Sequence, residues 1–324
     1  MALKIVMMAT GTFALPTFRQ LIDSQHEVVA LVTQPDRTGR GHHNHVNPLK
    51  ELALQKGIEV FQPVKANLPE SLEQLRSYNA DLFVVAAYGQ ILSAELLSIP
   101  RLGAINLHGS LLPKYRGAAP IQYSIWKGET RTGVTIFQIE PKLDAGPILG
   151  MLETEIGPKE TSGQLHDRLA ELSAPFALDI INQIEAGTVQ RIPQDSSLVT
   201  QSPRIRKEEG QIDWGRTSEE IGWHVRAMQP WPAPYTFLHL PDRPPVRLLI
   251  LDVDSVDDRP DSDAPAGTIE VRGNELLVRT GSGMIRVNTL QPAGKRAMSA
   301  ADYLRGTNLT RGRFGPETSP VPSS

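Results

Sequence analysis

Residues 80–107, ADLFVVAAYGQILSAELLSIPRLGAINL, contain two short apolar runs separated by a helical pattern. The runs at 80–87 and 104–107 have the length and the branched apolar residues of buried strands, and residues 94–98 suit a crossover helix between them. Three similar runs lie upstream, also alternating with helical patterns: 3–8, 27–33 and 58–61. This alternation predicts an α/β fold with a Rossmann-like, mostly parallel sheet that carries helices on both faces.

Downstream of this region the same domain continues for about 80 residues. A helix is expected at 120–126, followed by two more strands at 133–139 and 146–156. The segment 162–184 repeats apolar residues at spacings of three and four, which is typical of a helix with one face buried against a sheet. We therefore predict a first domain over residues 1–186.

A second domain is predicted after a polar, irregular linker at residues 187–206. Residues 207–314 contain a helix at 218–228 and then short strands joined by tight turns, a pattern that suits a small β-barrel of the oligonucleotide-binding (OB) type. The five expected strands are 235–239, 246–253, 267–271, 275–280 and 283–290. Residues 315–324, rich in Pro, Ser and Thr, are expected to form a tail.

Composition excludes several classes of protein and site. The chain has 324 residues and no cysteine, which removes disulfides, thiolate catalysis and cysteine-ligated metals. Its apolar runs are too short to cross a bilayer, and its start, MALKIVMMATGTF, lacks the cleavage site of a signal peptide. We expect a cytoplasmic protein, and a monomer as the simplest assembly.

The net charge of −3 argues against a general nucleic-acid binder, but the charges are unevenly distributed. Residues 272–313 contain eight cations and only two acids, a bias that an ordinary charged surface explains about as well as a nucleic-acid site. Just upstream, six aspartates lie between residues 252 and 263, which favours a solvated loop joining two strands.

The side chains most suited to chemistry lie at Asn106, His108 and Asp144. Residues two apart on a strand point to the same side, so Asn106 and His108 are expected to face one cleft beyond the carboxyl end of their strand. Asp144 lies in the turn between the sixth and seventh strands and can reach the same edge. An amide that stabilises an oxyanion, an imidazole that moves a proton and a carboxylate that orients it suit acyl transfer without a metal.

The nucleophile for such a transfer is not evident in the chain. Ser110 is close in sequence, but it lies in His-Gly-Ser-Leu-Leu and not in the Gly-x-Ser-x-Gly elbow of serine hydrolases. The attacking group is therefore expected to belong to a substrate. An isolated Asn-x-His near a strand end is also common in loops that only make structural hydrogen bonds, so the dipeptide alone does not establish catalysis.

The longer string around these residues resembles the folate-dependent formyltransferases. The matching segments are Asn106-Leu107-His108-Gly109-Ser110-Leu111-Leu112-Pro113, Arg116-Gly117, Ala119-Pro120-Ile121, Thr132-Gly133-Val134-Thr135 and Leu143-Asp144-Ala145-Gly146-Pro147. Other segments resemble the branch of this family that acts on methionyl initiator tRNA: Thr33 to Arg37 with Gly39-Arg40-Gly41, Ile212-Asp213-Trp214, Arg226-Ala227 with Pro230-Trp231-Pro232, and Leu290 to Arg296 with Met298. The resemblance extends from about Lys4 to Gly306.

The resemblance implies a reaction and its residues. The enzyme would transfer the formyl group of 10-formyltetrahydrofolate to the α-amine of methionyl initiator tRNA, releasing tetrahydrofolate and giving N-formylmethionyl-tRNA for translation initiation, without a metal. Asn106, His108 and Asp144 would be the catalytic residues. Folate would be held by two loops, whose residues are Ser110, Leu111, Leu112 and Pro113 in one and Gln90, Ile91 and Leu92 in the other.

The implied tRNA contacts are Arg37 and Arg40, in an insertion at residues 34–48, together with Lys295 and Arg296. Where relatives continue with lysines, this chain has His42, His43 and His45. Three interpretations stay open: a tRNA contact that strengthens on acidification, a site that chelates a metal, and a substitution without effect. A second departure from the family pattern is Ala9-Thr10-Gly11-Thr12 in place of the usual Gly-Thr-Pro after the first strand.

Two other functions stay open at this point. The same three residues could formylate the amine of a sugar nucleotide, although no attached dehydrogenase domain accompanies them here. Alternatively, the second domain could be an RNA-binding module on an inactive scaffold.

Overall fold

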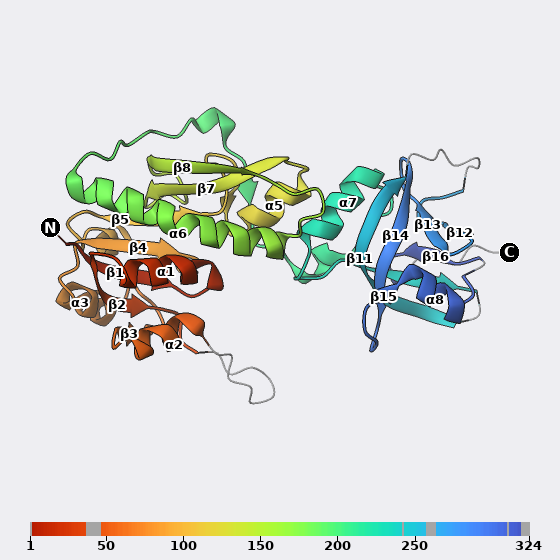
Figure 1. Cartoon of the computed structure of the whole chain (residues 1–324), viewed down its shortest axis with the longest axis horizontal. Coiled ribbons are helices and arrows are strands. Elements are labelled where there is room, and N and C mark those ends of the chain that lie inside the picture. Colours follow the sequence, from red (N-terminus) through yellow and green to blue (C-terminus); the bar gives the residue numbers. More distant parts are fainter. Residues whose placement is uncertain (1, 37–46, 242, 257–263, 310, 319–324) are drawn as a thin grey trace. The chain divides into compact units, whose positions relative to one another are not determined.

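The computed structural model describes residues 2–36, 47–241, 243–256, 264–309 and 311–318. The chain forms two compact units (Figure 1). The first unit consists of Met1–Pro120, Arg131–Glu155 and Leu165–Pro203. The second consists of Ile121–Thr130, Ile156–Gln164 and the chain from Arg204 onward. Most of the predicted linker, residues 187–206, thus lies in the first unit, while the predicted domain boundaries stay a prediction.

The first unit is built on a seven-stranded sheet in the order β3-β2-β1-β4-β5-β7-β8. The strands are β1 (Lys4–Ala9), β2 (Glu27–Val32), β3 (Glu59–Phe61), β4 (Leu82–Ala86), β5 (Ala104–His108), β7 (Arg131–Gln138) and β8 (Ile148–Glu155). The first five pair in parallel, whereas β7 and β8 pair in antiparallel fashion at one edge. The predicted mostly parallel sheet is confirmed.

Helices cover this sheet, and both of its faces are buried. The helices of the first unit are α1 (Leu15–Ile22), α2 (Pro48–Gln55), α3 (Pro69–Ser77), α4 (Ala94–Leu97) and α6 (Ser162–Ala186, which begins in the second unit). Val6 and Met8 of β1 pack in a cluster with Leu72 and Leu75 of α3. Alternate strand residues point to the other face, where Ile5 is also fully buried. Figure 1 shows α1 and α6 on the same side of the sheet, in front of its strands.

Local sequence explains where several of these helices begin. The Asn47 side chain accepts hydrogen bonds from the backbone N–H groups of Leu49 (3.1 Å) and Lys50 (3.3 Å), so it caps α2. Pro48 follows at the first helical position, where the missing N–H costs no hydrogen bond. Ser93 caps α4 in the same way by accepting from the N–H of Leu96.

The second unit is a curled antiparallel sheet in the order β12-β13-β14-β11-β10-β16, with β15 paired to β14, and it confirms the predicted small barrel-like domain. Its strands are β10 (Tyr235–Leu240), β11 (Arg243–Val256), β12 (Ile269–Arg272), β13 (Glu275–Arg279), β14 (Met284–Pro292), β15 (Met298–Ser299) and β16 (Arg313–Gly315). Its helices are α5 (Pro120–Trp126), α7 (Ser218–Ala227) and α8 (Ala300–Gly306). Ile221 and Val225 of α7 pack with Leu248 and Ile250 of β11 in one core.

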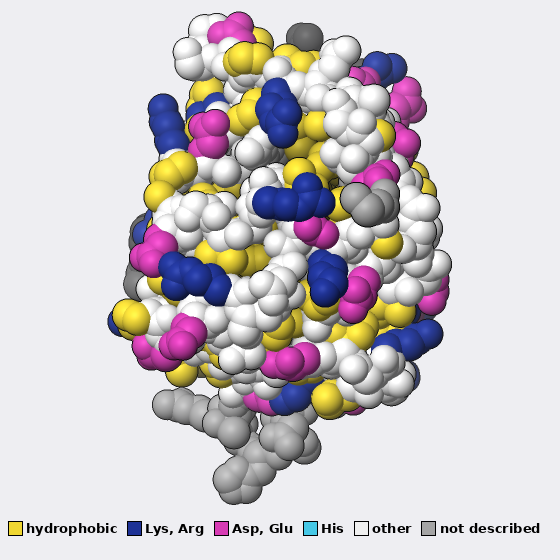
Figure 2. Space-filling view, turned by 90° about the vertical axis from the view of Figure 1, so that its left-hand side faces the viewer, with side chains coloured by type: hydrophobic (Ala, Val, Ile, Leu, Met, Phe, Trp, Pro, Cys, Tyr) yellow, Lys and Arg dark blue, Asp and Glu magenta, His cyan; other side chains and the backbone are white. Residues whose placement is uncertain are grey.

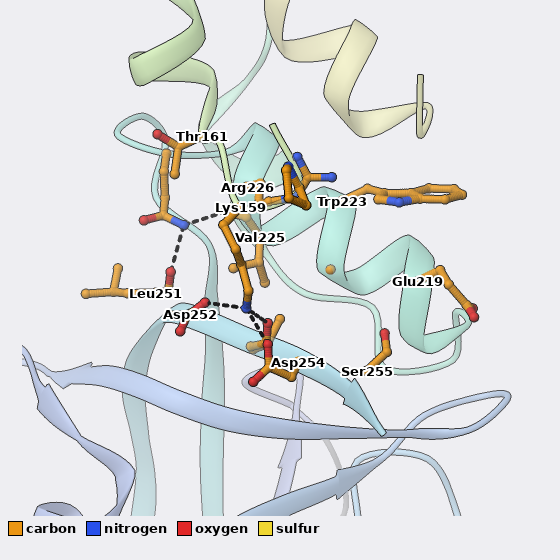
Figure 3. A pocket seen from close by; sticks show the side chains of 14 residues that line it. Lys159, Thr161, Glu219, Trp223, Val225, Arg226, Leu251, Asp252, Asp254 and Ser255 are labelled. Atoms are coloured by element: carbon orange, nitrogen blue, oxygen red, sulfur yellow. Dashed lines mark hydrogen bonds and ion pairs between the residues drawn. The ribbon is translucent and has the colours of Figure 1, made fainter. Parts of the chain in front are cut away.

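A cavity of about 220 Å³ in this unit is lined by Lys159, α7 and β11 (Figure 3). The Lys159 ammonium donates to the carbonyl of Val253 (2.7 Å) and to the carboxylates of Asp252 (2.9 Å) and Asp254. Asp254 also accepts from Asn288 and Arg286. The hydrogen bond from Lys159, followed by those from Asn288 and Arg286, holds the pKa of the Asp254 carboxyl far below the usual range. Asp252 lies on the strand that was expected at 246–253, whereas the expected loop is wrong for Asp254, because β11 extends to Val256. Residues 257–263 lie outside the described residues.

Charges of both signs are interspersed on the face shown in Figure 2. In the first unit Arg76 pairs with Glu95 and Arg101 with Asp81. Among the helices in the described ranges, none combines the length and the apolar character needed to span a membrane.

Candidate active site

Strand β5 brings Asn106 and His108 to the carboxyl edge of the parallel sheet. Asn106 is paired with Val85 of β4 on one side, and His108 with Thr135 of β7 on the other. Because the two residues are two positions apart, their side chains lie on the same face. Asn106 is half-buried, and its carboxamide has no hydrogen-bond partner among the residues that the structure describes. This amide is available to a ligand.

The His108 imidazole is held on both of its nitrogens and is only 5% exposed. Its Nε2 lies 2.8 Å from the carbonyl oxygen of Tyr115. A carbonyl oxygen can only accept, so the hydrogen of the neutral ring is on Nε2 and the lone pair is on Nδ1. Nδ1 lies 3.9 Å from Oδ2 of Asp144, and it is the nitrogen that can take up a proton.

Burial is the main influence on the charge of this imidazole. It lowers the pKa of His108 below the ordinary value of 6.5, since the charged form is poorly solvated inside the protein. The carboxylate of Asp144 and the Tyr115 carbonyl raise the pKa, while the positive charge of Arg116 lowers it further. His108 is therefore neutral at pH 7 and able to act as a base, and Asp144 favours the cation that forms when it does.

The loop between β7 and β8 presents Asp144 in a fixed conformation. Asp144 has a φ of +46°, in the left-handed region that residues other than glycine rarely occupy. Its Oδ2 accepts a hydrogen bond of 2.7 Å from the N–H of Gly117, and its backbone carbonyl accepts one of 2.9 Å from the Gln194 side chain. The structure thus brings His108 and Asp144 together, with Asn106 on the same face of β5 as His108.

The first of the two expected folate loops is stabilised by its own side chains. Ser110 is fully buried, and its hydroxyl donates to the carbonyl of Lys114 (2.7 Å) instead of facing solvent. Leu112 packs in the core against Phe137 and Ile148. Leu111 and Pro113 are half-buried, so they are the side chains of this loop that can contact a ligand.

The second expected folate loop follows β4. The Gln90 side chain accepts from the N–H of Ala66 (2.8 Å) and donates to the carbonyl of Val64 (3.2 Å), so it fixes a neighbouring loop. Leu92 is a core residue, only 8% exposed. Ile91 is 80% exposed, an unusual position for a large apolar side chain, and offers the contact surface of this loop.

The departure from the family pattern after β1 is accommodated against the end of β4. The Thr10 hydroxyl donates to the Tyr88 carbonyl (3.3 Å) and accepts from the N–H of Gln34 (3.2 Å). At Gly11 a Cβ would lie 3.3 Å from the Cβ of Ala87, a tight approach that glycine relieves. The loop after β1 is thus hydrogen-bonded to the segments that follow β2 and β4.

The cations expected to contact tRNA fall into two groups. Arg37 and Arg40, together with His42, His43 and His45, lie outside the described residues. Lys295 and Arg296 are exposed on the turn between β14 and β15, and no acidic side chain of the described ranges pairs with either of them. By contrast, other arginines of the basic region have acidic partners: Arg272 pairs with Glu270, Arg286 with Asp254 and Glu275, and Arg305 with Asp302.

Sequence reasoning missed the residues that hold the loop after His108. Residues 192–203, here called the return segment, run beside this loop, and β9 (Gln201–Ser202) pairs in parallel with β6 (Arg116–Gly117). Gln194 accepts from the Arg116 guanidinium (2.7 Å) and donates to the carbonyls of Asp144 and Gly146. A polar, irregular sequence carries no local signal of such contacts, so the segment was predicted to be a linker.

Residues 3–180 match the family model described as formyl transferase, and residues 204–308 match the formyl transferase C-terminal domain. The chain belongs to the formyl transferase family. It is 42% identical to the methionyl-tRNA formyltransferase of Methylococcus capsulatus over 97% of this chain and 100% of that relative. The predicted family is therefore confirmed, and the protein is a transferase.

Two solved structures share the fold at low sequence identity. The N-formyltransferase from Helicobacter canadensis, in complex with folinic acid and dTDP-3-aminofucose, aligns with a TM-score of 0.64 at 17% identity, covering 90% of this chain and 100% of that one. HypX from Aquifex aeolicus aligns with a TM-score of 0.61 at 14% identity over 95% of this chain. The match covers 49% of HypX, so this chain spans about half of that protein.

Proposed function

We propose that this formyltransferase transfers the formyl group of 10-formyltetrahydrofolate to the α-amine of methionyl initiator tRNA. The observation that carries the proposal is the buried His108 beside Asp144, on the same strand face as the Asn106 amide, which has no partner among the described residues. The identity of 42% to a methionyl-tRNA formyltransferase over 97% of this chain supports the choice of substrate.

The residues present fit the flat faces of the aromatic rings of a folate. Ile91 is exposed, and Leu111 and Pro113 are half-buried, so the loops after β4 and β5 offer apolar contacts at the carboxyl edge of the sheet. The folate supplies an activated formyl group on N10. It acts as a cosubstrate, and we propose no metal in the reaction.

The chain's own residues would divide the chemistry as follows. Nδ1 of His108 takes the proton from the substrate amine, whose nitrogen forms the new bond to the formyl carbon. The Asn106 amide donates to the oxygen of that carbon as it becomes negative, and Asp144 stabilises the imidazolium. His108 then returns the proton to N10 as the bond from N10 to the formyl carbon breaks, so that tetrahydrofolate leaves and the imidazole is neutral again.

The proposal extends to assembly, compartment and domain roles. We propose that the protein works as a monomer in the cytoplasm, where charged initiator tRNA is used. Residues 1–186 would carry the chemistry, and residues 207–314 would bind tRNA. Arg37 and Arg40 are kept as proposed contacts beside Lys295 and Arg296.

The substrate is tested by incubating the protein with formyl-labelled 10-formyltetrahydrofolate and one of two acceptors. We expect label on methionine when the acceptor is methionyl initiator tRNA, and none when it is an amino-sugar nucleotide. Uncharged initiator tRNA is the control for label that is only bound. Label found on the sugar alone would contradict the proposal and favour the sugar-nucleotide function.

The tRNA surface is tested at the turn between β14 and β15. Lys295 has no acidic partner among the described residues. The turn that carries it is anchored to β11, because the N–H of Ala293 donates to the carbonyl of Arg247. The Arg247 guanidinium itself lies 4.1 Å from the ring centre of Tyr235. Lys295→Ala should raise KM for tRNA and reduce the slope of log affinity against log salt by about one charge. Arg305→Ala is the matched control, because Asp302 already neutralises Arg305. An equal loss of tRNA affinity in both variants, or an unchanged salt slope in Lys295→Ala, would show that Lys295 does not contact tRNA.

A further inference from the structure

The return segment contacts the active-site loop through two hydroxyl groups. The Thr200 hydroxyl accepts a hydrogen bond of 2.8 Å from the N–H of Tyr115. The Ser202 hydroxyl donates one of 2.8 Å to the carbonyl of Tyr115. Each side of Tyr115 is thus fixed by a residue more than 80 positions away in the sequence, in a segment that contributes no residue to the proposed chemistry.

The Tyr115 carbonyl is also the acceptor for His108. Its oxygen lies 2.8 Å from Nε2 of His108 and 2.8 Å from Oγ of Ser202, so it receives two donors. One carbonyl oxygen has two lone pairs, which these donors fill. The position of this oxygen decides which nitrogen of the neutral ring carries the hydrogen, and therefore which nitrogen can accept a proton.

Tyr115 requires such support because of its backbone conformation. Its φ is +61°, in the left-handed region that is unfavourable for a residue with a large side chain. The carbonyl of Ser202 accepts from the N–H groups of Ala118 (2.8 Å) and Ala119 (3.1 Å), which anchors the far end of the loop. At Gly117 a Cβ would lie 2.6 Å from this same carbonyl, so only glycine allows the active-site loop and the return segment to approach this closely.

We propose that Ser202 and Thr200 are positioning residues that hold the Tyr115 peptide so that its carbonyl keeps the hydrogen of His108 on Nε2 and leaves Nδ1 open toward Asp144. The inference rests on the proposed function for its effect on turnover, but its effect on the imidazole does not depend on any substrate. Ser202 is fully buried, and its hydroxyl makes no other hydrogen bond among the described residues.

The hydroxyl groups can be removed with little change in shape. Ser202→Ala deletes one oxygen, and the backbone pairing of β6 with β9 is retained because it uses main-chain atoms. Thr200→Val replaces the acceptor by a methyl group at an exposed position, where the larger hydrocarbon is tolerated, and Thr200→Ser keeps the acceptor. Ser197→Ala is the control on the same segment, since among the described residues the Ser197 hydroxyl bonds only to Asp195.

We expect Ser202→Ala and Thr200→Val each to lower kcat by about tenfold to a hundredfold, as a small misplacement of a catalytic group does, with KM for both substrates changed less than about twofold. Thr200→Ser and Ser197→Ala should retain kcat. The second readout is the nitrogen NMR spectrum of the free protein labelled on its histidines, with the His108 signals assigned by their loss in His108→Asn. In the two defective variants, part of the His108 population should carry its hydrogen on Nδ1.

The two readouts separate the inference from the proposed function. If the wild-type protein fails to formylate methionyl initiator tRNA but the His108 signals shift as described, the positioning role stands and the substrate is wrong. If Ser202→Ala does not fold, the comparison of Thr200→Val with Thr200→Ser, at an exposed position, still tests the inference. Wild-type kcat together with unchanged His108 signals in Thr200→Val and in any folded Ser202→Ala would overturn the inference.

Discussion

Replacing His108 by alanine is expected to lower kcat for methionyl-tRNA formylation by about 10³-fold, within the range that general acid–base catalysis contributes. The variant loses the base Nδ1 that faces Asp144, while the folate contacts proposed at Ile91, Leu111 and Pro113 are retained. Folate binding, measured by fluorescence titration, should therefore stay detectable. Turnover is measured from the label transferred to methionine.

The chain offers a matched control for this variant. His166 also contacts a carboxylate, with Nδ1 2.9 Å from Asp167, but it lies on α6, where its ring packs edge-on against Phe13. His166→Ala should keep wild-type turnover. Equal turnover in His108→Ala and the wild type would remove His108 from the mechanism.

The same imidazole sets the expected pH dependence. The base must be neutral, and burial lowers the pKa of His108 from its ordinary 6.5, so the ratio of wild-type kcat to His108→Ala kcat should stay constant as the pH falls to 6.5 and decline only below it. Taking the ratio removes the titration of the substrate amine, which both proteins share. A decline centred above 6.5 would show that another group titrates.

Replacing Asn106 by alanine is expected to lower kcat by about 10²-fold to 10³-fold, the effect of removing one donor from an oxyanion site. The amide has no partner among the described residues, so its loss leaves no other protein group unpaired, and the free energy of unfolding should change little. Single-turnover rates at saturating substrates would measure the chemical step directly.

A second substitution makes this test specific. Asn106→Asp keeps the shape but replaces the donor by a carboxylate, which would repel a developing negative charge, so it should be at least as slow as Asn106→Ala. Turnover within about twofold of the wild type in either variant, or a loss confined to KM for the folate, would contradict the proposed role.

Much of the fold could be predicted because the apolar residues of its long elements follow regular patterns along the sequence. The five parallel strands and α6 repeat apolar residues at the spacings of buried strands and of an amphipathic helix, so the sheet was predicted almost strand by strand. In the second unit β15, β16 and α8 were missed. Each has seven residues or fewer and gains its stability from pairing or packing with distant elements, so a local pattern cannot distinguish it from a turn.

The site divides in a similar way. Asn106 and His108 could be placed together because strand alternation relates neighbours in the sequence, and Asp144 because it follows an adjacent strand. Ser202 and Gln194 could not be placed, because their contacts with Tyr115 and Arg116 span 87 and 78 residues and involve ordinary polar side chains. For Ser110 and Gln90 the resemblance indicates the loops, whereas the hydrogen bonds show that both side chains are used inside the protein.

The chain passes from one unit to the other several times, and this has a consequence for its synthesis. The segments Ile121–Thr130 and Ile156–Gln164 leave the ribosome long before the rest of the second unit. Lys159 can bind Asp252 and Asp254 only after they have been synthesised, and they are 93 and 95 residues further along the chain. Ser202 emerges earlier than either. A nascent chain can therefore complete the surroundings of His108 while the second unit still lacks most of its strands, so the order of translation favours assembly of the catalytic unit first.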